Sequence, residues 1–184
     1  MRNLIIITGD LASGKSTLAN SLSEELNIPC LIKDDLKEIA CDAIGYSTRE
    51  ENRNLSICAV NAMIYFFEKS AKVGADLILE ANFRTAEIAQ IKEIADQYYY
   101  HVLLIKLAGD INLLYQRFLD RLPSRHIAHK SLHLDSSIDN FAMYIESIRN
   151  EDTIYPSYDI DMSELDEEEV VNQSLEIVHN ELGI

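Results

Sequence analysis

Residues 9–17 read Gly9-Asp10-Leu11-Ala12-Ser13-Gly14-Lys15-Ser16-Thr17, and this stretch decides the fold. It matches the pattern G-x-x-x-x-G-K-[ST], in which a loop of backbone N–H groups holds the phosphates of a nucleotide. The two glycines allow the backbone angles that turn those N–H groups inward. Lys15 supplies a charge for the β- and γ-phosphates, and the Ser16 hydroxyl is a ligand for Mg²⁺. The pattern therefore predicts that these residues form an ATP site with bound Mg²⁺.

The segments on both sides of this loop fit the same prediction. Leu4–Ile7 is a short apolar run rich in β-branched residues, as expected of a buried strand. A helix is expected over Lys15–Leu26, because leucines recur on one of its faces. The N-terminus of that helix would direct its positive dipole end at the phosphates. The dinucleotide-binding pattern G-x-G-x-x-G is absent, because Leu11 stands where its second glycine would be.

Strands and helices are expected to alternate along the rest of the chain. Thr48 and Glu51 form a capping-box signature before a long helical pattern that Gly74 ends, and Asp110 can cap a helix that runs through Arg121. Such alternation implies parallel strands joined by helical crossovers. We therefore expect an α/β fold, a three-layer sandwich around a parallel sheet of about five strands, with residues 1–184 as a single domain. The expected strands are 4–7, 29–32, 76–80, 101–107 and 158–160, and the expected helices are 15–26, 48–72, 85–98, 110–121, 136–148 and 163–182.

The composition restricts the partners. The chain has 16 basic and 31 acidic side chains, a formal charge of −15. Binding to a long nucleic acid depends on basic residues that displace condensed counterions, so this balance opposes such a partner. No stretch approaches the roughly 18 consecutive apolar residues of a membrane span, and we expect a cytoplasmic protein without a membrane partner. The sequence gives no indication of an oligomeric state.

A pair of carboxylates follows the second expected strand, in Lys33-Asp34-Asp35-Leu36-Lys37. The carboxyl ends of parallel strands open on the ligand crevice of such a sheet. A carboxylate there can take the proton of an acceptor hydroxyl during phosphoryl transfer. Asp34 or Asp35 is therefore a candidate general base. The alternative is that one of them only caps the helix that follows.

Two further stretches carry candidate site residues. The third expected strand leads into Leu77-Ile78-Leu79-Glu80-Ala81-Asn82-Phe83-Arg84, so that Glu80 ends the strand next to the phosphate loop. The second of these stretches is 117–129. Arg117 and Arg121 lie there on one face of a helix, and Arg125, His126 and His129 follow. Pro123 ends that helix, and we interpret residues 122–135 as a short lid. The two histidines have no carboxylate or cysteine at metal-ligand spacing, so a metal site is not expected there.

Other classes of P-loop protein do not fit. A switch GTPase would show a D-x-x-G segment after the third strand and an N-K-x-D motif, and neither occurs. Motor ATPases carry additional domains that 184 residues cannot hold. The phosphate loop and the three later stretches instead resemble the small P-loop kinases, a group that includes polynucleotide kinase, zeta-toxin-like kinases and chloramphenicol phosphotransferase. The resemblance covers most of the chain and implies a nucleotide kinase-like P-loop NTPase fold.

The resemblance also implies roles for single residues. The aspartate of polynucleotide kinase that corresponds to Asp34 is its general base, and Asp35 takes this role if the register differs by one. Lys37 stands where relatives carry an arginine and would bind an acceptor phosphate as a point charge rather than as a fork. Glu80 stands where relatives usually carry an aspartate and would orient a Mg²⁺-bound water.

The same resemblance places Asn82 and Arg84 at the acceptor site. Kinases of this group set arginines from the lid region over the phosphates, where they neutralise the charge of the transition state. Arg121 matches this role best and Arg125 second. A plain surface role remains the alternative for Arg84 and for the lid arginines.

The function expected from these residues is ATP-dependent phosphoryl transfer to a hydroxyl group of a small molecule, nucleoside or nucleotide. A nucleoside monophosphate kinase is one alternative, with Lys37, Arg49, Arg53 and Arg84 as ligands of the acceptor phosphate. A regulatory or toxin-like module, in which bound ATP serves a protein partner, is another.

Overall fold

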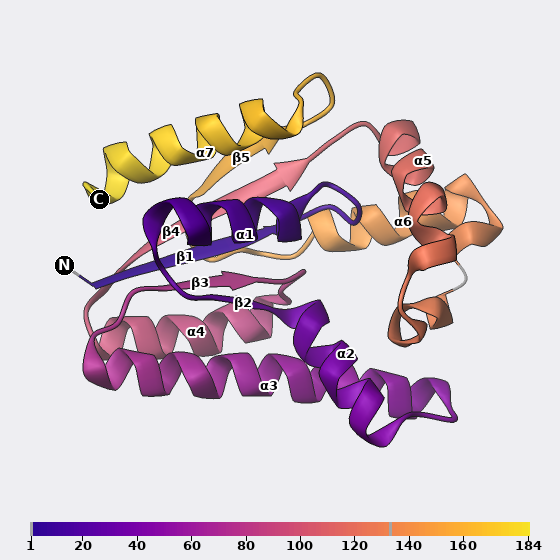
Figure 1. Cartoon of the computed structure of the whole chain (residues 1–184), viewed down its shortest axis with the longest axis horizontal. Helices are drawn as coiled ribbons and strands as arrows, with labels where there is room; N and C mark the ends of the chain where they lie inside the picture. Colours follow the sequence, from indigo (N-terminus) through magenta and orange to yellow (C-terminus); the bar gives the residue numbers. More distant parts are fainter. Residues whose placement is uncertain (1, 133) are drawn as a thin grey trace.

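A computed structural model describes residues 2–132 and 134–184 of the chain. Its centre is a parallel sheet of five strands in the order β2-β3-β1-β4-β5, with β1 between β3 and β4 (Figure 1). From β1 the chain crosses first to the edge strand β2, returns to β3 beside β1, and then continues on the other side of β1 to β4 and β5, so that strands lie on both sides of β1 as in doubly wound α/β folds. The strands are β1 (Arg2–Gly9), β2 (Cys30–Ile32), β3 (Leu77–Glu80), β4 (Tyr100–Ala108) and β5 (Ser157–Asp161).

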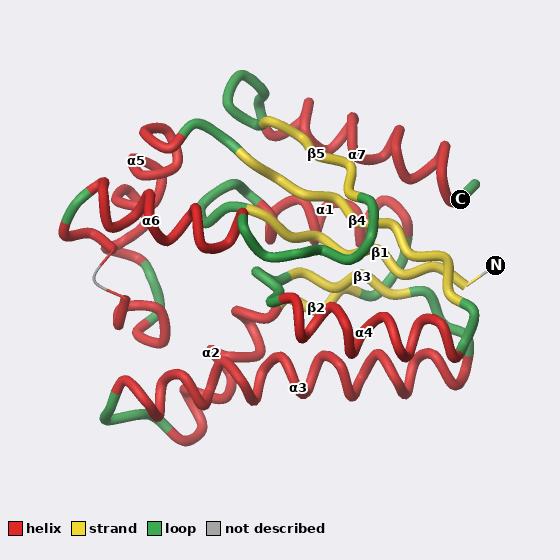
Figure 2. The backbone as a smooth tube through the Cα atoms, turned by 180° about the vertical axis from the view of Figure 1, so that it is seen from behind, coloured by secondary structure: helices red, strands yellow, loops and turns green. Residues whose placement is uncertain are grey.

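Two helical layers cover the sheet, and the alternation of side chains along β1 explains why. Leu4 and Ile6 are buried among residues of α3 and α4, whereas Ile5 and Ile7 are buried among residues of α1, α5, α6 and α7. A strand buried on both faces reads as a continuous apolar run. Figures 1 and 2 show α3 and α4 on one face and α1 with α7 on the other. The helices are α1 (Lys15–Leu26), α2 (Lys33–Ile44), α3 (Arg49–Val73), α4 (Thr85–Gln97), α5 (Ile111–Arg121), α6 (Ile138–Arg149) and α7 (Glu167–Leu182).

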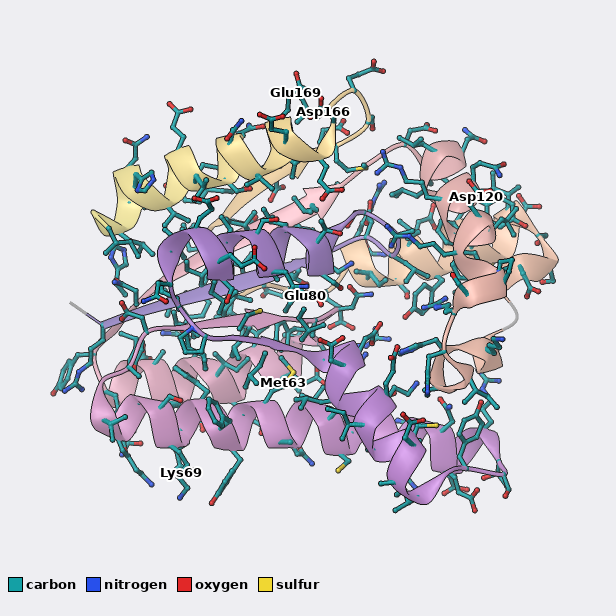
Figure 3. The ribbon with its side chains drawn as sticks, viewed as in Figure 1. Met63, Lys69, Glu80, Asp120, Asp166 and Glu169 are labelled. Carbon is teal, nitrogen blue, oxygen red and sulfur yellow. The ribbon has the colours of Figure 1, made fainter. Side chains whose placement is uncertain are left out.

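The helix α3 illustrates how sequence fixes these elements. Thr48 and Glu51 form both hydrogen bonds of the capping box, and Gly74 ends the helix with a left-handed backbone (φ 72°). Met63 is fully buried against the sheet, and Lys69 points away from it (Figure 3). Together, the five-stranded parallel sheet and the helical layers on its two faces confirm the expected three-layer α/β sandwich.

Three expectations about elements need correction. The expected helices include none with bounds at Lys33–Ile44, although the capping alternative for Asp34 and Asp35 implies a helix there, and α2 begins directly after β2 without a linker. The last helix begins at Glu167 rather than at 163, because Asp166 and Glu169 form its capping box. Within the expected lid, the structure has short 3₁₀ helices at Leu122–Ser124, Ile127–Leu132 and Leu134–Ser136. Residue 133 of that segment lies outside the described residues.

All five strands point the same way, so their carboxyl ends share one edge of the sheet. The phosphate loop, the starts of α2 and α3 and the segment 122–136 gather beyond that edge (Figure 1). This edge is where open α/β sheets bind their ligands. Within the described ranges, no helix is both long enough and apolar enough to cross a membrane.

Candidate active site

The loop between β1 and α1 owes its shape to three residues with positive φ. Gly9 has φ 124°, and a Cβ atom there would overlap the backbone of Leu107, so only glycine fits. Gly14 has φ 90° and is the N-cap residue of α1, and Ala12 is left-handed at φ 64°. The first N–H groups of a helix have no intrahelical partner, which leaves those at the start of α1 available to a ligand.

The loop residues divide into a base and a lining. Gly9, Asp10 and Ser13 are buried and form the base, where the hydroxyl of Ser13 donates to the Asp10 carbonyl at 2.8 Å. The others line a cavity of about 630 Å³, here called the P-loop cavity. The loop residues in this lining are Leu11, Ala12, Gly14, Lys15, Ser16 and Thr17.

The ammonium group of Lys15 lies inside the loop. Its Nζ donates to the carbonyl oxygen of Asp10, and the residue is buried. Burial lowers the pKa of Lys15, against the opposing effect of the carboxylates of Glu80, Asp34 and Asp10. A desolvated cation at this position favours an anionic ligand.

The side chain of Asp10 is fixed by Arg149, which the sequence analysis did not single out. Asp10 is fully buried, and its carboxylate accepts hydrogen bonds from Arg149 Nε (3.1 and 3.2 Å) and Nη2 (2.5 Å). The N–H of Gly109 donates to the same carboxylate at 3.2 Å, and Arg149 Nη2 also donates to the Gly109 carbonyl at 2.8 Å. A residue at the end of α6 therefore holds the base of the phosphate loop.

Ser16 and Glu80 lie together next to Lys15. Ser16 Oγ donates to Glu80 Oε2 at 3.1 Å, and Glu80 is only 4% exposed. Burial raises the pKa of Glu80, against the opposing effects of Lys15 and the Ser16 hydrogen bond. Figure 3 shows Glu80 beneath the N-terminal end of α1.

This hydroxyl and carboxylate are the oxygen donors that Mg²⁺ prefers, and such a cation would compensate a desolvated carboxylate. No group of three or more His, Cys, Asp or Glu in the described ranges can hold a metal by itself. Mg²⁺ at this position would therefore depend on the nucleotide phosphates and on water for its other ligands, which is its usual mode of binding.

Asp34 and Asp35 lie in the first turn of α2, and neither is its N-cap residue, which is Ile32. Burial raises the pKa of Asp34, but the positive charges of Lys33 and Arg125, together with the imidazole of His129, outweigh it, so that the net pKa is lowered. Burial and the neighbouring carboxylates raise the pKa of Asp35. The two residues thus lie in opposite electrostatic surroundings, and Asp34 is kept ionised.

A second cavity of about 980 Å³, here called the α3 cavity, adjoins the P-loop cavity. Its lining comes from α2, α3, the segment 125–129, the segment 82–87 that leads into α4, and Tyr144 of α6. Asp35 lines only the P-loop cavity, whereas Asp34 lines both. The residues common to both linings are Leu11, Lys33, Asp34, Asn82, Arg125 and His129.

Two polar atoms on this common wall are unsatisfied. Oδ1 of Asn82 and Nη1 of Arg125 are buried and have no hydrogen-bond partner among the described residues. The guanidinium of Arg125 lies 5.2 Å from the ring centroid of Phe118, which fixes its position. Native proteins rarely leave buried polar atoms unpaired, so these two indicate a place for a ligand.

The segment 122–136 is attached to α2 and α3 by several hydrogen bonds. The carbonyl of Ala128 accepts from Lys37 Nζ (2.7 Å) and Asn52 Nδ2 (2.9 Å), and Lys37 also donates to Asn52 (2.9 Å). His129 Nε2 lies 2.9 Å from Glu38, and His126 Nε2 lies 3.0 Å from Asp42. The histidines thus pair with carboxylates of α2. Burial lowers the pKa of Lys37 to about 8.

The remaining site residues of the sequence analysis differ in their freedom to bind a ligand. Arg121 is exposed, lines the P-loop cavity and has no ion pair in the described part of the chain. Arg84 also borders the α3 cavity, but its Nη1 is paired with Glu151 at 2.8 Å. Lys37 is buried and hydrogen-bonded by the protein. The structure therefore gives Arg84 and Lys37 protein partners, which the resemblance to kinases did not foresee.

Comparison with solved structures gives the fold a context. The chain is similar to a provisionally assigned kinase from Chloroflexus aurantiacus (TM-score 0.83, 26% identity, 98% of each chain covered). It is also similar to a gluconokinase from Sinorhizobium meliloti, with a TM-score of 0.65 and 14% identity over 97% of this chain and 93% of that one. A third similar structure is shikimate kinase from Bacteroides thetaiotaomicron, with a TM-score of 0.64 and 16% identity over the whole of both chains. No family model and no curated protein matches the sequence. The chain has the fold of the small P-loop kinases, and the predicted resemblance is confirmed.

Proposed function

We propose that this chain is an ATP-dependent phosphotransferase that acts on a hydroxyl group of a small molecule. One observation carries the proposal: the cavity lined by the phosphate loop and the α3 cavity meet at a common wall that contains Asp34. Phosphoryl transfer requires a nucleotide site and an acceptor site that meet at a proton acceptor. Kinases among the similar structures support the same activity.

The P-loop cavity would hold the triphosphate. Lys15 would exchange its hydrogen bond with the Asp10 carbonyl for the β- and γ-phosphate oxygens, and the N–H groups at the start of α1 would bind the same oxygens. Mg²⁺ held by Ser16, with Glu80 acting through water, would neutralise charge on the phosphates. Arg121 and Arg125 line the same cavity and would stabilise charge that develops on the transferred group.

The acceptor would enter from the α3 cavity, with its hydroxyl facing Asp34. A bond forms between the acceptor oxygen and the γ-phosphorus, and the bond from that phosphorus to the β–γ bridging oxygen breaks. The hydroxyl proton passes to the Asp34 carboxylate, and the products are ADP and a phosphate ester. The Asp34 carboxylate is ionised, since its surroundings lower its pKa, and its oxygen takes up the proton as the bond from the acceptor oxygen to phosphorus forms and the hydroxyl becomes more acidic.

The test is an ATP-consumption screen over sugars, nucleosides, aminoglycosides and short 5′-hydroxyl oligonucleotides, with Mg²⁺ present. For any acceptor that supports turnover, we expect Asp34→Asn to lower kcat by roughly 10²–10⁴-fold and to leave ATP affinity nearly unchanged. Asp35→Asn is the matched control, since Asp35 lines only the P-loop cavity. Loss of turnover in Asp35→Asn with full activity in Asp34→Asn would move the base by one residue. A chain that binds ATP but turns over no acceptor would favour a regulatory module.

A further inference from the structure

The α3 cavity has the opposite charge balance from the rest of the chain. Six basic and three acidic residues line it, whereas the whole chain has 16 basic and 31 acidic residues. A cavity that concentrates cations in an acidic protein attracts anions and repels cations. The basic residues are Lys33, Lys37, Arg49, Arg53, Arg84 and Arg125.

Three of these cations are already engaged by the protein. Lys33 Nζ lies 3.6 Å from Asp34 Oδ1. Lys37 donates hydrogen bonds to Asn52 and to the carbonyl of Ala128, and Arg84 forms an ion pair with Glu151. A cation with a carboxylate or carbonyl partner gains less from a ligand, because that partner has to be displaced. The protein partners therefore remove two of the four acceptor ligands expected from the sequence, Lys37 and Arg84.

Arg49 and Arg53 are the other two. Neither forms an ion pair or a hydrogen bond with another side chain in the described ranges. They are four residues apart in α3, so their side chains lie on the same face of the helix, at the cavity. Two free guanidinium groups on one face can bind a carboxylate or phosphate together, each through its fork of N–H donors.

The same face of α3 becomes apolar toward the sheet. Ile57 and Val60 follow Arg53 by four and seven residues, and both line the cavity. Figure 1 shows that the N-terminal end of α3 extends beyond the carboxyl edge of the strands, and because α3 begins at Arg49, the two arginines precede Ile57 and Val60 along the helix toward that end. A ligand with a charged group at one end and carbon skeleton at the other matches this lining.

We propose that the acceptor is a hydroxylated anion, a carboxylate or a phosphate monoester, whose charged group is bound by Arg49 and Arg53 while its hydroxyl faces Asp34. This inference rests on the proposed kinase function for the role of Asp34, but the anion site can be tested without any turnover. The carbon skeleton lies along Ile57 and Val60. The arginines therefore select the acceptor, and the cavity wall at Asp34 orients it.

The first experiment measures binding of inorganic phosphate and of malonate, a dicarboxylate, by the full chain at low salt. The chain carries Lys15→Met, which weakens anion binding in the phosphate loop. The dependence of the thermal unfolding midpoint on anion concentration gives an apparent Kd. We expect the double change Arg49→Gln and Arg53→Gln to raise this Kd at least about tenfold for one of the two anions, since it removes the charge-assisted hydrogen bonds from both guanidinium groups. The anion that shows the effect distinguishes a phosphate site from a carboxylate site.

Lys69→Gln is the matched control for charge. It removes one positive charge from the same helix, 16 residues or about 24 Å from Arg53, where the side chain points away from the sheet (Figure 3). Its Kd is expected to equal that of the parent. Equal Kd values for the parent and the arginine variant, or no binding of either anion by the parent, would overturn the proposal.

The second experiment follows from the acceptor screen. Glucose, glucuronate and glucose 6-phosphate are compared, together with cytidine and cytidine monophosphate, so that each anion has a neutral counterpart. With any anionic acceptor that is turned over, Arg53→Gln should raise KM about tenfold with little change in kcat, because it removes binding that ground state and transition state share. Preferred turnover of a neutral acceptor would overturn the anion site and leave the kinase proposal intact. Failure to bind ATP would contradict the kinase proposal without affecting the anion measurement.

Discussion

The phosphate loop and the α3 cavity are the two halves of the candidate site, and they are built differently. The loop is one continuous stretch, and backbone angles at Gly9, Ala12 and Gly14 fix its shape. The α3 cavity takes its walls from several segments far apart in the sequence, among them α2, α3 and the segment 122–136, which meet at the carbonyl of Ala128. A function carried by backbone can be encoded locally, whereas a function carried by side chains of distant segments needs the folded chain.

The phosphate loop is not encoded only locally, because its base also depends on a residue far away in the sequence. Arg149 is far from Asp10 in sequence, yet it supplies most of the hydrogen bonds to that buried carboxylate. Removing the Arg149 contact therefore tests whether the phosphate loop holds its shape by itself.

Arg149→Met should destabilise the chain by about 2–3 kcal/mol, because it leaves the buried Asp10 carboxylate with the Gly109 N–H as its remaining donor. Chemical denaturation at pH 7 measures this change. Combining it with Asp10→Asn should restore part of the loss, since the neutral amide costs less to bury than an unpaired charge. Equal stability of wild type and Arg149→Met would show that the loop does not rely on this pair.

Lys15→Met tests the local half by itself. We expect ATP affinity to fall by roughly 30-fold, about 2 kcal/mol, because one charge-assisted contact to the phosphates is lost. Stability without ligand should not fall, because the substitution removes a desolvated ammonium group. Titration calorimetry with ATP and Mg²⁺ checks the affinity, and unchanged binding would exclude the phosphate loop as the nucleotide site.

A change at Glu151, which pairs with Arg84 at the border of the α3 cavity, is expected to have the smallest effect on the free energy of unfolding. Hydrogen bonds from the Thr85 N–H, from Arg84 and from the Thr85 hydroxyl lower the pKa of Glu151 to about 2. Because this pKa is depressed on folding, its contribution is present above an ordinary pKa of 4.5 and is lost as the pH falls toward 2.

Glu151→Gln should therefore cost about 1 kcal/mol at pH 7, a value reduced for solvent screening of this partly exposed group. The difference from wild type should shrink between pH 4.5 and 2. Denaturation curves of both proteins across this range provide the measurement. A difference that stays constant with pH would mean that the charge of Glu151 does not contribute.

The contrast between the halves also explains what could be predicted from sequence. The sheet, most helices and the phosphate loop follow from short patterns such as the run Leu4–Ile7 and the caps at Thr48 and Asp110. The bounds of α2 were not predicted, because its N-cap residue is Ile32, which has no side chain that can cap. No local pattern predicts the role of Arg149, because its partner Asp10 lies far away in the sequence.

The acceptor half was predicted less well for a related reason. The motif around Asp34 placed the carboxylates at the right edge of the sheet, and the structure separates Asp34 from Asp35 by the cavities that they line. Lys37 and Arg84 looked like free cations in the sequence, but Asn52 and Glu151 engage them. Whether a cation is free or paired depends on contacts between segments, and neither pattern nor spacing carries that information.

The most direct test of the account is a crystal structure of the chain with Mg²⁺ and a non-hydrolysable ATP analogue. We expect the triphosphate on the backbone of residues 9–17, Lys15 on the β- and γ-phosphates, Mg²⁺ on the Ser16 hydroxyl, and the γ-phosphate facing Asp34 across the wall between the two cavities. Arg121 is predicted to contact the phosphates. A γ-phosphate turned away from Asp34, or an analogue bound in the α3 cavity, would contradict it.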